Sequence, residues 1–219
     1  MTIKLYEIDE TYINYLKQYD NKLLSNHFKT HNRKYLGVGL KINNNDYFMP
    51  LSSPDAKDYD KFGNPRKTIV PIFRIFDHKK NFLGKVLINN MIPVPSSELV
   101  PYDIQKEKDL KYKSLITKQV RVLNKNDKTL IKNAKLLYKQ KNMKFNIKYL
   151  KATVDFKVLE NAKNKYVNRT KVKNISNNKS NVKINKSTTK TSYLKLNQEF
   201  IAKEEKKKYT KVVTKNKQI

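Results

Sequence analysis

The sequence predicts an α+β protein with a basic extension at its C-terminal end, and three observations support this. Residues 35–42, YLGVGLKI, alternate between apolar and other residues, which is the period of a half-buried strand. Two further strand-like runs follow at 69–76 and 81–89, and from about residue 110 the apolar residues recur at helical spacing. Helices gathered at one end of an antiparallel sheet are typical of the α+β class.

The first strand is predicted at 4–8, and Asp9 is placed to cap a helix that begins at residue 10. The apolar stripe of this helix would consist of Tyr12, Leu16, Tyr19 and Leu23. In the strand at 35–42, we expect Gly37 and Gly39 to mark a sharp bend or a close backbone approach. The polar run NNND at 43–46 then leads into a strand at 47–51, which predicts a hairpin.

The runs at 69–76 and 81–89 are joined by the polar DHKK, and Pro71 places the first of them at an edge or a bulge. MIPVP at 91–95 breaks the sheet pattern. Helices are then expected over about 110–123, over 130–138 with Asn126 or Asp127 as cap, and from Asp155 through Ala162.

The chain is strongly basic: its 219 residues include 48 Lys and Arg against 19 Asp and Glu, a formal charge of +29. This bias predicts a polyanionic partner, because a cation near a phosphate releases condensed counterions. Abundant Lys and Asn, as in proteins from AT-rich genomes, is the alternative explanation.

Two domains are predicted. Residues 1–166 should form the globular one, and 167–219 a Lys/Asn-rich extension that is disordered or ordered on RNA. The extension has 15 Lys and Arg against three acidic residues, so +12 of the charge lies there and +17 in the domain.

The sequence lacks the motifs that several classes of function require. The chain has no cysteine, which excludes disulfides and thiolate sites, and no GxSxG or glycine-rich phosphate loop. Asp55, Asp58 and Asp60 lack calcium-loop spacing, so we expect them to solvate a turn, and His27 and His31 to form a surface pair. We expect no metal or cofactor. Neither a signal peptide nor a membrane span is predicted, so a cytoplasmic location is expected.

Metal-free chemistry on a phosphate remains. RNA carries its own nucleophile, the 2′-hydroxyl, so a protein need only move two protons and stabilise the charged phosphorane. The stretch YFMPLSSPDAKD at 47–58 offers suitable groups, because an apolar strand ends there at Ser52 and Ser53, and Lys57 follows. The alternative is a strand-ending turn in which the hydroxyls bond to their own backbone.

Five segments resemble, in order, the ToxN/AbiQ group of type III toxin–antitoxin endoribonucleases. They are YINYLKQYD at 12–20, NRKYLGVGLKINNNDYFMPLSSP at 32–54, NFLGKVLINNMIPVP at 81–95, YKSLITKQVRVLNKNDKTLIKNAKLLY at 112–138 and ATVDFKVLENAKNKY at 152–166. Each motif is weak singly, but five in order are fairly specific.

The resemblance implies a strongly curved antiparallel sheet, a partly open core like that of a small toxin barrel, with flanking helices. It also implies metal-independent RNA cleavage that leaves a 2′,3′-cyclic phosphate. The partner would be a repetitive pseudoknot RNA antitoxin that the enzyme processes and with which it forms closed rings. Released toxin would act on cellular or phage RNA and arrest growth during infection.

The resemblance also assigns the site. Ser53 matches the catalytic serine, Ser52 the supporting hydroxyl, Tyr12 a tyrosine lining the cleft and Lys34 a lysine that contacts phosphate. Tyr12 could equally be a core aromatic, and Lys34 a solvated lysine at a strand end.

The chain departs from the family pattern at two positions. Asp55 stands where many relatives have a lysine, so Lys57 is assigned the role of general acid or phosphorane stabiliser. Thr30 and His31 occupy the region of a family tyrosine, and His31 is a candidate for proton transfer.

Basic residues are candidates for gripping the RNA backbone: Arg33, Arg66, Lys67, Lys113, Lys118 and Arg121. Tyr47 and Phe48 could stack a base, although strand core is the expected place for them. Two other functions stay open at this point, a non-catalytic RNA-binding protein and a phage or plasmid structural protein with a basic tail.

Overall fold

The computed structural model describes residues 3–28 and 31–170, and the side chains of His27, Phe28 and His31 lie outside the described part. Contacts within the chain gather Met1–Val167 into one compact unit and Asn168–Ile219 into another. Of the second unit only 168–170 are described, as exposed helical residues. The predictions for 171–219 and for the His27–His31 pair therefore concern groups outside the described residues.

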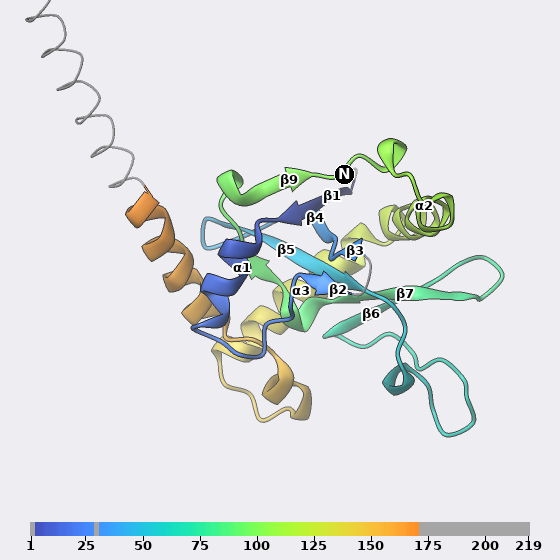
Figure 1. The fold of residues 1–219 in the computed structure, drawn as a ribbon. Helices are drawn as coiled ribbons and strands as arrows, with labels where there is room; N and C mark the ends of the chain where they lie inside the picture. Colours follow the sequence, from blue (N-terminus) through green and yellow to red (C-terminus); the bar gives the residue numbers. More distant parts are fainter. Residues whose placement is uncertain (1–2, 29–30, 171–219) are drawn as a thin grey trace, which may run out of the picture. The chain divides into compact units, whose positions relative to one another are not determined.

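The first unit mixes helices with an antiparallel sheet (Figure 1), which confirms the predicted α+β class. Its strands are β1 Lys4–Ile8, β2 His27–Phe28, β3 His31–Asn32, β4 Tyr35–Ile42, β5 Asn45–Ser52, β6 Ile72–Phe76, β7 Phe82–Leu87, β8 Ile92–Pro93 and β9 Leu99–Pro101. Its helices are α1 Glu10–Lys17, α2 Leu110–Asn124, α3 Asp127–Asn142 and one from 156 onward, with 3₁₀ turns η1 Ala56–Asp58, η2 Ile88–Asn90, η3 Ser96–Glu98, η4 Ile104–Lys106 and η5 Lys148–Ala152.

The main sheet runs in the order β6-β7-β5-β4-β1-β9, and every pair is antiparallel. The strand β5 is central: one edge pairs with β4, and the other pairs first with β8 and then, at Leu51 and Ser52, with β7. Among the described strands β6 and β9 remain edges, so the sheet does not close into a barrel.

The β4–β5 hairpin forms as predicted, with a two-residue turn at Asn43 and Asn44. Both residues have positive φ, +47° and +60°, as a type I′ turn requires. The pairing of β4 shifts between Gly37 and Leu40, and Gly39 has a φ of +63°, which confirms a bend at the glycines. At Gly37 a Cβ would lie 2.7 Å from Cε2 of Tyr6, so that glycine marks a close approach.

The predicted boundaries hold less well than the predicted elements. The helix capped by Asp9 ends at Lys17, so Tyr19 and Leu23 lie beyond it, although Leu23 is still buried. The predicted strand at 69–76 begins only at Ile72, because Pro71 lies in a turn, and its place at a sheet edge is confirmed. The expectation that MIPVP at 91–95 breaks the sheet pattern was wrong, because β8 lies in this segment and pairs with β5.

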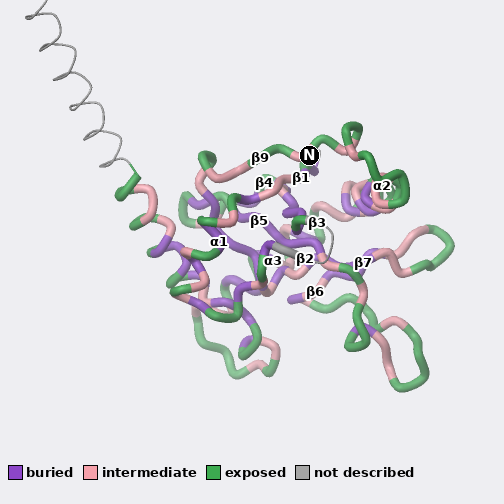
Figure 2. The backbone as a smooth tube through the Cα atoms, in the orientation of Figure 1, coloured by how far each residue is buried: buried purple, intermediate pink, exposed green. Residues whose placement is uncertain are grey.

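The core lies between the sheet and the helices (Figure 2), with α2 packed against β6 and β7 and α3 against β4. The helix that starts at 156 begins as predicted, because Asp155 accepts a 3.1 Å hydrogen bond from the Val158 amide. Tyr47 and Tyr138 both donate to the buried Glu160 carboxylate, at 2.9 and 2.8 Å. Tyr47 is thus a core residue.

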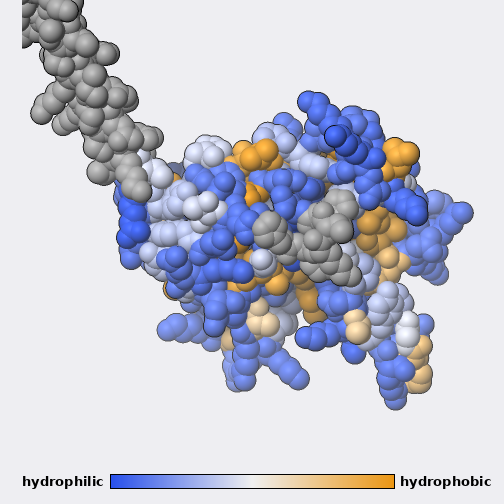
Figure 3. Space-filling view, in the orientation of Figure 1, coloured by the Kyte–Doolittle hydropathy of each residue, from blue (hydrophilic) through white to orange (hydrophobic). Residues whose placement is uncertain are grey.

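Most of the surface that faces the viewer in Figure 3 is hydrophilic. Within the described ranges, no helix combines the length and the apolar character needed to cross a membrane.

Candidate active site

The two serines lie where β5 leaves the sheet. Leu51 is buried, Ser52 is half-buried and Ser53 is exposed, so the chain moves from core to solvent over three residues. Pro54 follows and ends the strand, because proline has no amide hydrogen for the ladder. We call residues 52–58, which include η1, the serine turn. Its beginning is held in place by the Leu51 amide, which donates to Lys34 O at 2.8 Å.

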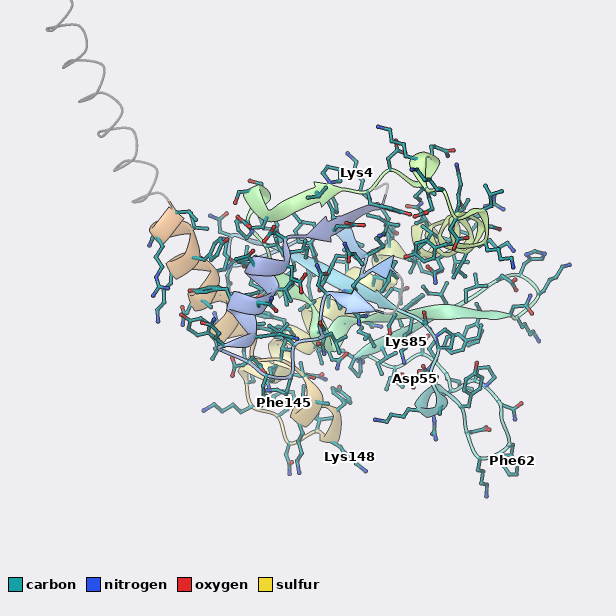
Figure 4. All side chains as sticks on the ribbon, in the orientation of Figure 1. Lys4, Asp55, Phe62, Lys85, Phe145 and Lys148 are labelled. Carbon is teal, nitrogen blue, oxygen red and sulfur yellow. The ribbon has the colours of Figure 1, made fainter. Side chains whose placement is uncertain are left out.

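Lys85 lies directly opposite Ser52 in the β5–β7 pairing. It is only 5% exposed, and its Nζ donates to Asp55 Oδ2 at 2.7 Å and also to Asp58 Oδ2. Figure 4 shows Lys85 on β7 next to Asp55 of the serine turn. Lys85 could not be predicted from the sequence, because it stands inside an apolar strand pattern where a single lysine carries no local signal.

Asp58 closes the cluster. Its carboxylate is buried and accepts from Arg74 Nη2 at 2.9 Å, from Arg74 Nε at 3.1 Å, from Lys85 and from the Asp55 amide at 3.1 Å. Burial by itself would raise the Asp58 pKa, but these hydrogen bonds and charges hold it below its ordinary value. The expectation that Asp58 merely solvates a turn was wrong, because Arg74 and Lys85 are brought to it by strands distant in sequence.

A glycine lets the two strands approach at this point. Gly84 has a φ of +143°, and a Cβ on it would lie 2.9 Å from Ser52 O and 2.7 Å from Gln119 Nε2. Gln119 of α2 donates from that nitrogen to Leu83 O at 2.8 Å. The GK dipeptide of the 81–95 motif therefore supplies both the close approach and the lysine.

Lys57 stands on η1 and is exposed. Its backbone amide donates to Asp55 Oδ1 at 2.9 Å, which fixes the turn. Among the described residues its ammonium has no ion-pair partner, so it is available to a ligand of the serine turn.

Lys34 is buried rather than solvated. It is 4% exposed, pairs with Glu7, donates to Asn32 O at 3.2 Å and lies 4.3 Å from the centre of the Tyr102 ring. The alternative of a solvated lysine at a strand end was wrong, because Glu7 and Tyr102 enclose the Lys34 ammonium. The predicted contact of Lys34 with phosphate stays a prediction.

Arg33 does not present its charge to solvent. It is 7% exposed, and its guanidinium donates to Ser25 O at 3.0 Å and to Leu51 O at 2.9 Å. Burial lowers its pKa below the ordinary value. Arg33 connects the 25–26 segment to the residue before Ser52. That it grips RNA stays a prediction.

Tyr12 is a core residue. Its side chain is fully buried, its hydroxyl donates to Pro93 O at 2.7 Å, and its ring packs edge-on against Tyr166 with centroids 5.0 Å apart. Burial raises its pKa well above the ordinary value. The core alternative is therefore the one that the structure shows, and the catalytic role that the resemblance assigns to Tyr12 stays a prediction. The side chain of His31 lies outside the described residues.

The basic residues predicted to bind RNA separate into groups. Lys118 and Arg121 line a cavity of about 480 Å³ between the second half of α2 and the β6–β7 turn, together with His78, Lys79 and Lys125. The carboxylate of Asp77 in this cavity is occupied by the Lys79 and Asn81 amides, at 2.8 and 2.9 Å, which leaves the cations in excess.

The other basic residues lie elsewhere. Lys113 donates to Gln105 O at 2.6 Å and does not join the cavity. Arg66 and Lys67 are exposed on the loop that follows the serine turn, where Arg66 Nε donates to Tyr59 O at 2.9 Å.

Comparison with known proteins decides the family. Residues 4–165 match the model of toxin ToxN of the type III toxin–antitoxin systems. The chain belongs to the ToxN toxin family. The resemblance noted in the sequence is thereby confirmed.

The ToxN-family relatives include two proteins named as endoribonucleases. AbiQ from Lactococcus lactis subsp. lactis is 32% identical over 172 residues, which cover 73% of this chain and 87% of AbiQ. ToxN from Bacillus thuringiensis subsp. kurstaki is 37% identical over 125 residues, covering 56% of this chain and 60% of that protein. The match thus spans less than two-thirds of the Bacillus protein.

Two solved ToxN-family structures share the fold. One is a type III toxin that a non-coding RNA pseudoknot inhibits, 31% identical with a TM-score of 0.65, covering 76% of this chain and 98% of that one. The other is AbiQ, a lactococcal anti-phage endoribonuclease, 28% identical with a TM-score of 0.64, covering 77% and 99%. The open sheet with flanking helices is thus the family fold, as the sequence predicted.

Proposed function

We propose that this ToxN-family protein is an endoribonuclease that cuts RNA at the serine turn without a metal ion. The observation that carries the proposal is the convergence there of an exposed hydroxyl, Ser53, an available ammonium, Lys57, and the anchored Lys85 opposite Ser52. Hydroxyl and ammonium donors are the groups that a phosphodiester needs for attack by its own 2′-hydroxyl.

In the proposed reaction the RNA 2′-oxygen loses its proton and bonds to the adjacent phosphorus. The bond from phosphorus to the 5′-oxygen breaks, and that oxygen takes up a proton. The products are a 2′,3′-cyclic phosphate and a free 5′-hydroxyl. Ser53 donates a hydrogen bond to the scissile phosphate, while Lys57 stabilises the phosphorane and protonates the leaving oxygen. Each such contribution is typically worth about a hundredfold or more in rate.

Lys85 is assigned a positioning role, because Asp55 and Asp58 already hold its ammonium. By joining β7 to the turn it fixes where Ser52 and Ser53 point. Tyr12 is a poor candidate for removing the 2′-proton, because its hydroxyl already donates to Pro93 O in the core. His31 remains the candidate to be tested by substitution.

The test is cleavage of a single-stranded oligoribonucleotide by the purified chain in excess chelator, with products identified by mass. We expect a cyclic-phosphate product, no cut when the scissile 2′-hydroxyl is replaced by hydrogen, and a loss of about a hundredfold or more for Ser53→Ala. Ser97→Ala, at an exposed serine of η3, is the matched control and should cut normally. Activity that required added Mg²⁺, or a fully active Ser53→Ala protein, would contradict the proposal.

We further propose that a repetitive pseudoknot RNA encoded beside the gene inhibits the protein, is processed by it, and assembles with it into closed rings. The support is the +17 charge of residues 1–166 and the inhibition of a related toxin by a pseudoknot RNA. The protein would act on cellular or phage RNA in the cytoplasm as a defence against phage.

Co-expression with the repetitive RNA encoded beside the gene should restore the growth of cells in which the protein alone arrests it. Native mass spectrometry of the complex should then give equal numbers of protein and RNA subunits. A non-catalytic RNA binder is the second candidate, favoured by the basic cavity at Lys118 and Arg121. In that case Ser53→Ala would leave the growth arrest unchanged.

A further inference from the structure

We propose that Phe62 is a stacking platform for an unpaired base of the substrate RNA, near the phosphate that is cut. The inference rests on the proposed function and adds to it a residue that helps to choose the cleavage sequence. Phe62 is 76% exposed, at the tip of the loop that leaves the serine turn (Figure 4). An aromatic ring this far from the core gains nothing from burial, and stacking on bases is a common use of such rings.

Hydrogen bonds within the loop order the backbone at its tip. The Asp60 carboxylate accepts from the Phe62 and Asn64 amides, both at 2.9 Å. The Asp60 amide donates to Asn64 O at 2.9 Å, and Gly63 turns the chain with a φ of +81°. These bonds fix the backbone of Phe62, so a base that stacks on the ring meets a platform that is already ordered.

The base of the loop is anchored to the candidate site. The Arg66 amide donates to Asp58 O at 2.8 Å, and Tyr59 pairs with Pro65 across the loop. Asp58 is the buried carboxylate that holds Lys85, so loop and serine turn share one fixed point. Phe62 is four residues from Asp58, so its Cα lies within about 14 Å of that point. RNA bound at Ser53 can extend a few nucleotides to the ring.

The charge around the ring favours RNA over a protein partner. The exposed cations near the tip are Lys57, Lys61, Arg66 and Lys67. Lys61 Nζ lies 4.9 Å from the centre of the Phe62 ring. The nearby Asp60 carboxylate is directed at backbone amides of the loop. Proteins that bind single-stranded nucleic acids combine exposed aromatic rings with cations. The cations contact the phosphates, and a base stacks on the ring.

The test measures kcat/KM for cleavage of a single-stranded RNA of random sequence, and then of the best substrate found. We expect Phe62→Ala to lower kcat/KM about 5- to 150-fold, the range of base stacking on an aromatic residue, and Phe62→Trp to keep it. Leu110→Ala is the matched control, because Leu110 is equally exposed at 76% but lies at the start of α2. It should leave kcat/KM unchanged.

A second measurement separates stacking from a general disturbance of the loop. Abasic nucleotides are placed one at a time beside the scissile phosphate. At one position the missing base should lower kcat/KM of the unsubstituted protein. The same missing base should cause no further loss in the Phe62→Ala protein, which has no ring for the base to stack on. A Phe62→Ala protein that cuts within twofold of the unsubstituted one, or whose defect persists with every abasic substrate, overturns the inference alone. An unsubstituted protein that cuts no RNA overturns the proposed function and this inference with it.

Discussion

Lys85 and Asp58 form a buried ion pair between strand β7 and the turn that follows the serines, and Arg74 of β6 completes it from the other side. Asp55 accepts a further hydrogen bond from the Lys85 amine, at 2.7 Å. The turn therefore carries an amine supplied by the neighbouring strand as well as its own Lys57.

Removing the Asp58 charge should destabilise the fold. Asp58→Asn leaves two buried cations, Lys85 and Arg74, without a full counter-charge, and breaking a buried pair typically costs about 3–5 kcal/mol. The measurement is urea unfolding. Asp46→Asn is the control, because Asp46 is exposed and pairs with Lys41 only at 3.9 Å, so its loss should cost less than about 1 kcal/mol. Equal losses in the two variants would contradict the central place given to Asp58.

The same carboxylate should make stability depend on pH in the acid range. The folded Asp58 pKa lies below its ordinary value of 3.8. Its stabilisation is thus complete above that value and is lost as pH falls through the folded pKa, because the unfolded chain then binds the proton more readily. Melting curves below about pH 4 should show Asp58→Asn and the unsubstituted protein converging. Parallel curves throughout would refute this.

The close approach of β7 to the serine turn should not tolerate a side chain. Gly84→Ala combines a φ of +143° with contacts of 2.9 Å to Ser52 O and 2.7 Å to Gln119 Nε2, so we expect a loss of about 2–4 kcal/mol and slower RNA cleavage. Gly63→Ala has a φ of +81° but no atom within 4 Å, so its stability loss should be smaller, about 1–2 kcal/mol. A reversed order in urea unfolding would contradict the packing argument.

The basic cavity should contribute to RNA affinity through phosphate contacts. With an RNA single strand, each lost contact lowers the slope of log K against log salt concentration by about 0.7, so Lys118→Ala with Arg121→Ala should lower it by about 1.4. The control pair is Lys41→Ala with Lys106→Ala, which removes the same charge from exposed sites outside the cavity. If the two double variants behave alike, only net charge matters.

The domain assignment can be tested by ending the chain after residue 170. The core residues lie within Met1–Val167, so the shortened protein should keep its melting temperature within a few degrees and still cut RNA. It loses 14 lysines and three glutamates, and RNA affinity should fall most at low salt. Loss of folding would show that residues after 170 belong to the domain.

The sequence by itself determined the local parts of this protein. The period of 35–42 and the polar NNND produced the hairpin, Asp9 and Asp155 capped their helices, and the serine motif marked the end of β5. Each of these depends on neighbours within a few residues, which a pattern can represent. Net charge and the ordered family motifs likewise needed no coordinates to indicate a polyanionic partner.

Only the tertiary structure decided which side chains meet. Lys85 joins the serine turn because β7 pairs with the end of β5. Asp58 is buried because two strands bring cations to it, and Lys34 is enclosed by Glu7 and Tyr102. Tyr12 and Arg33 turned inward for the same reason. Whether a charged or polar side chain faces solvent depends on groups far away in the sequence, and no local period records where those groups fold.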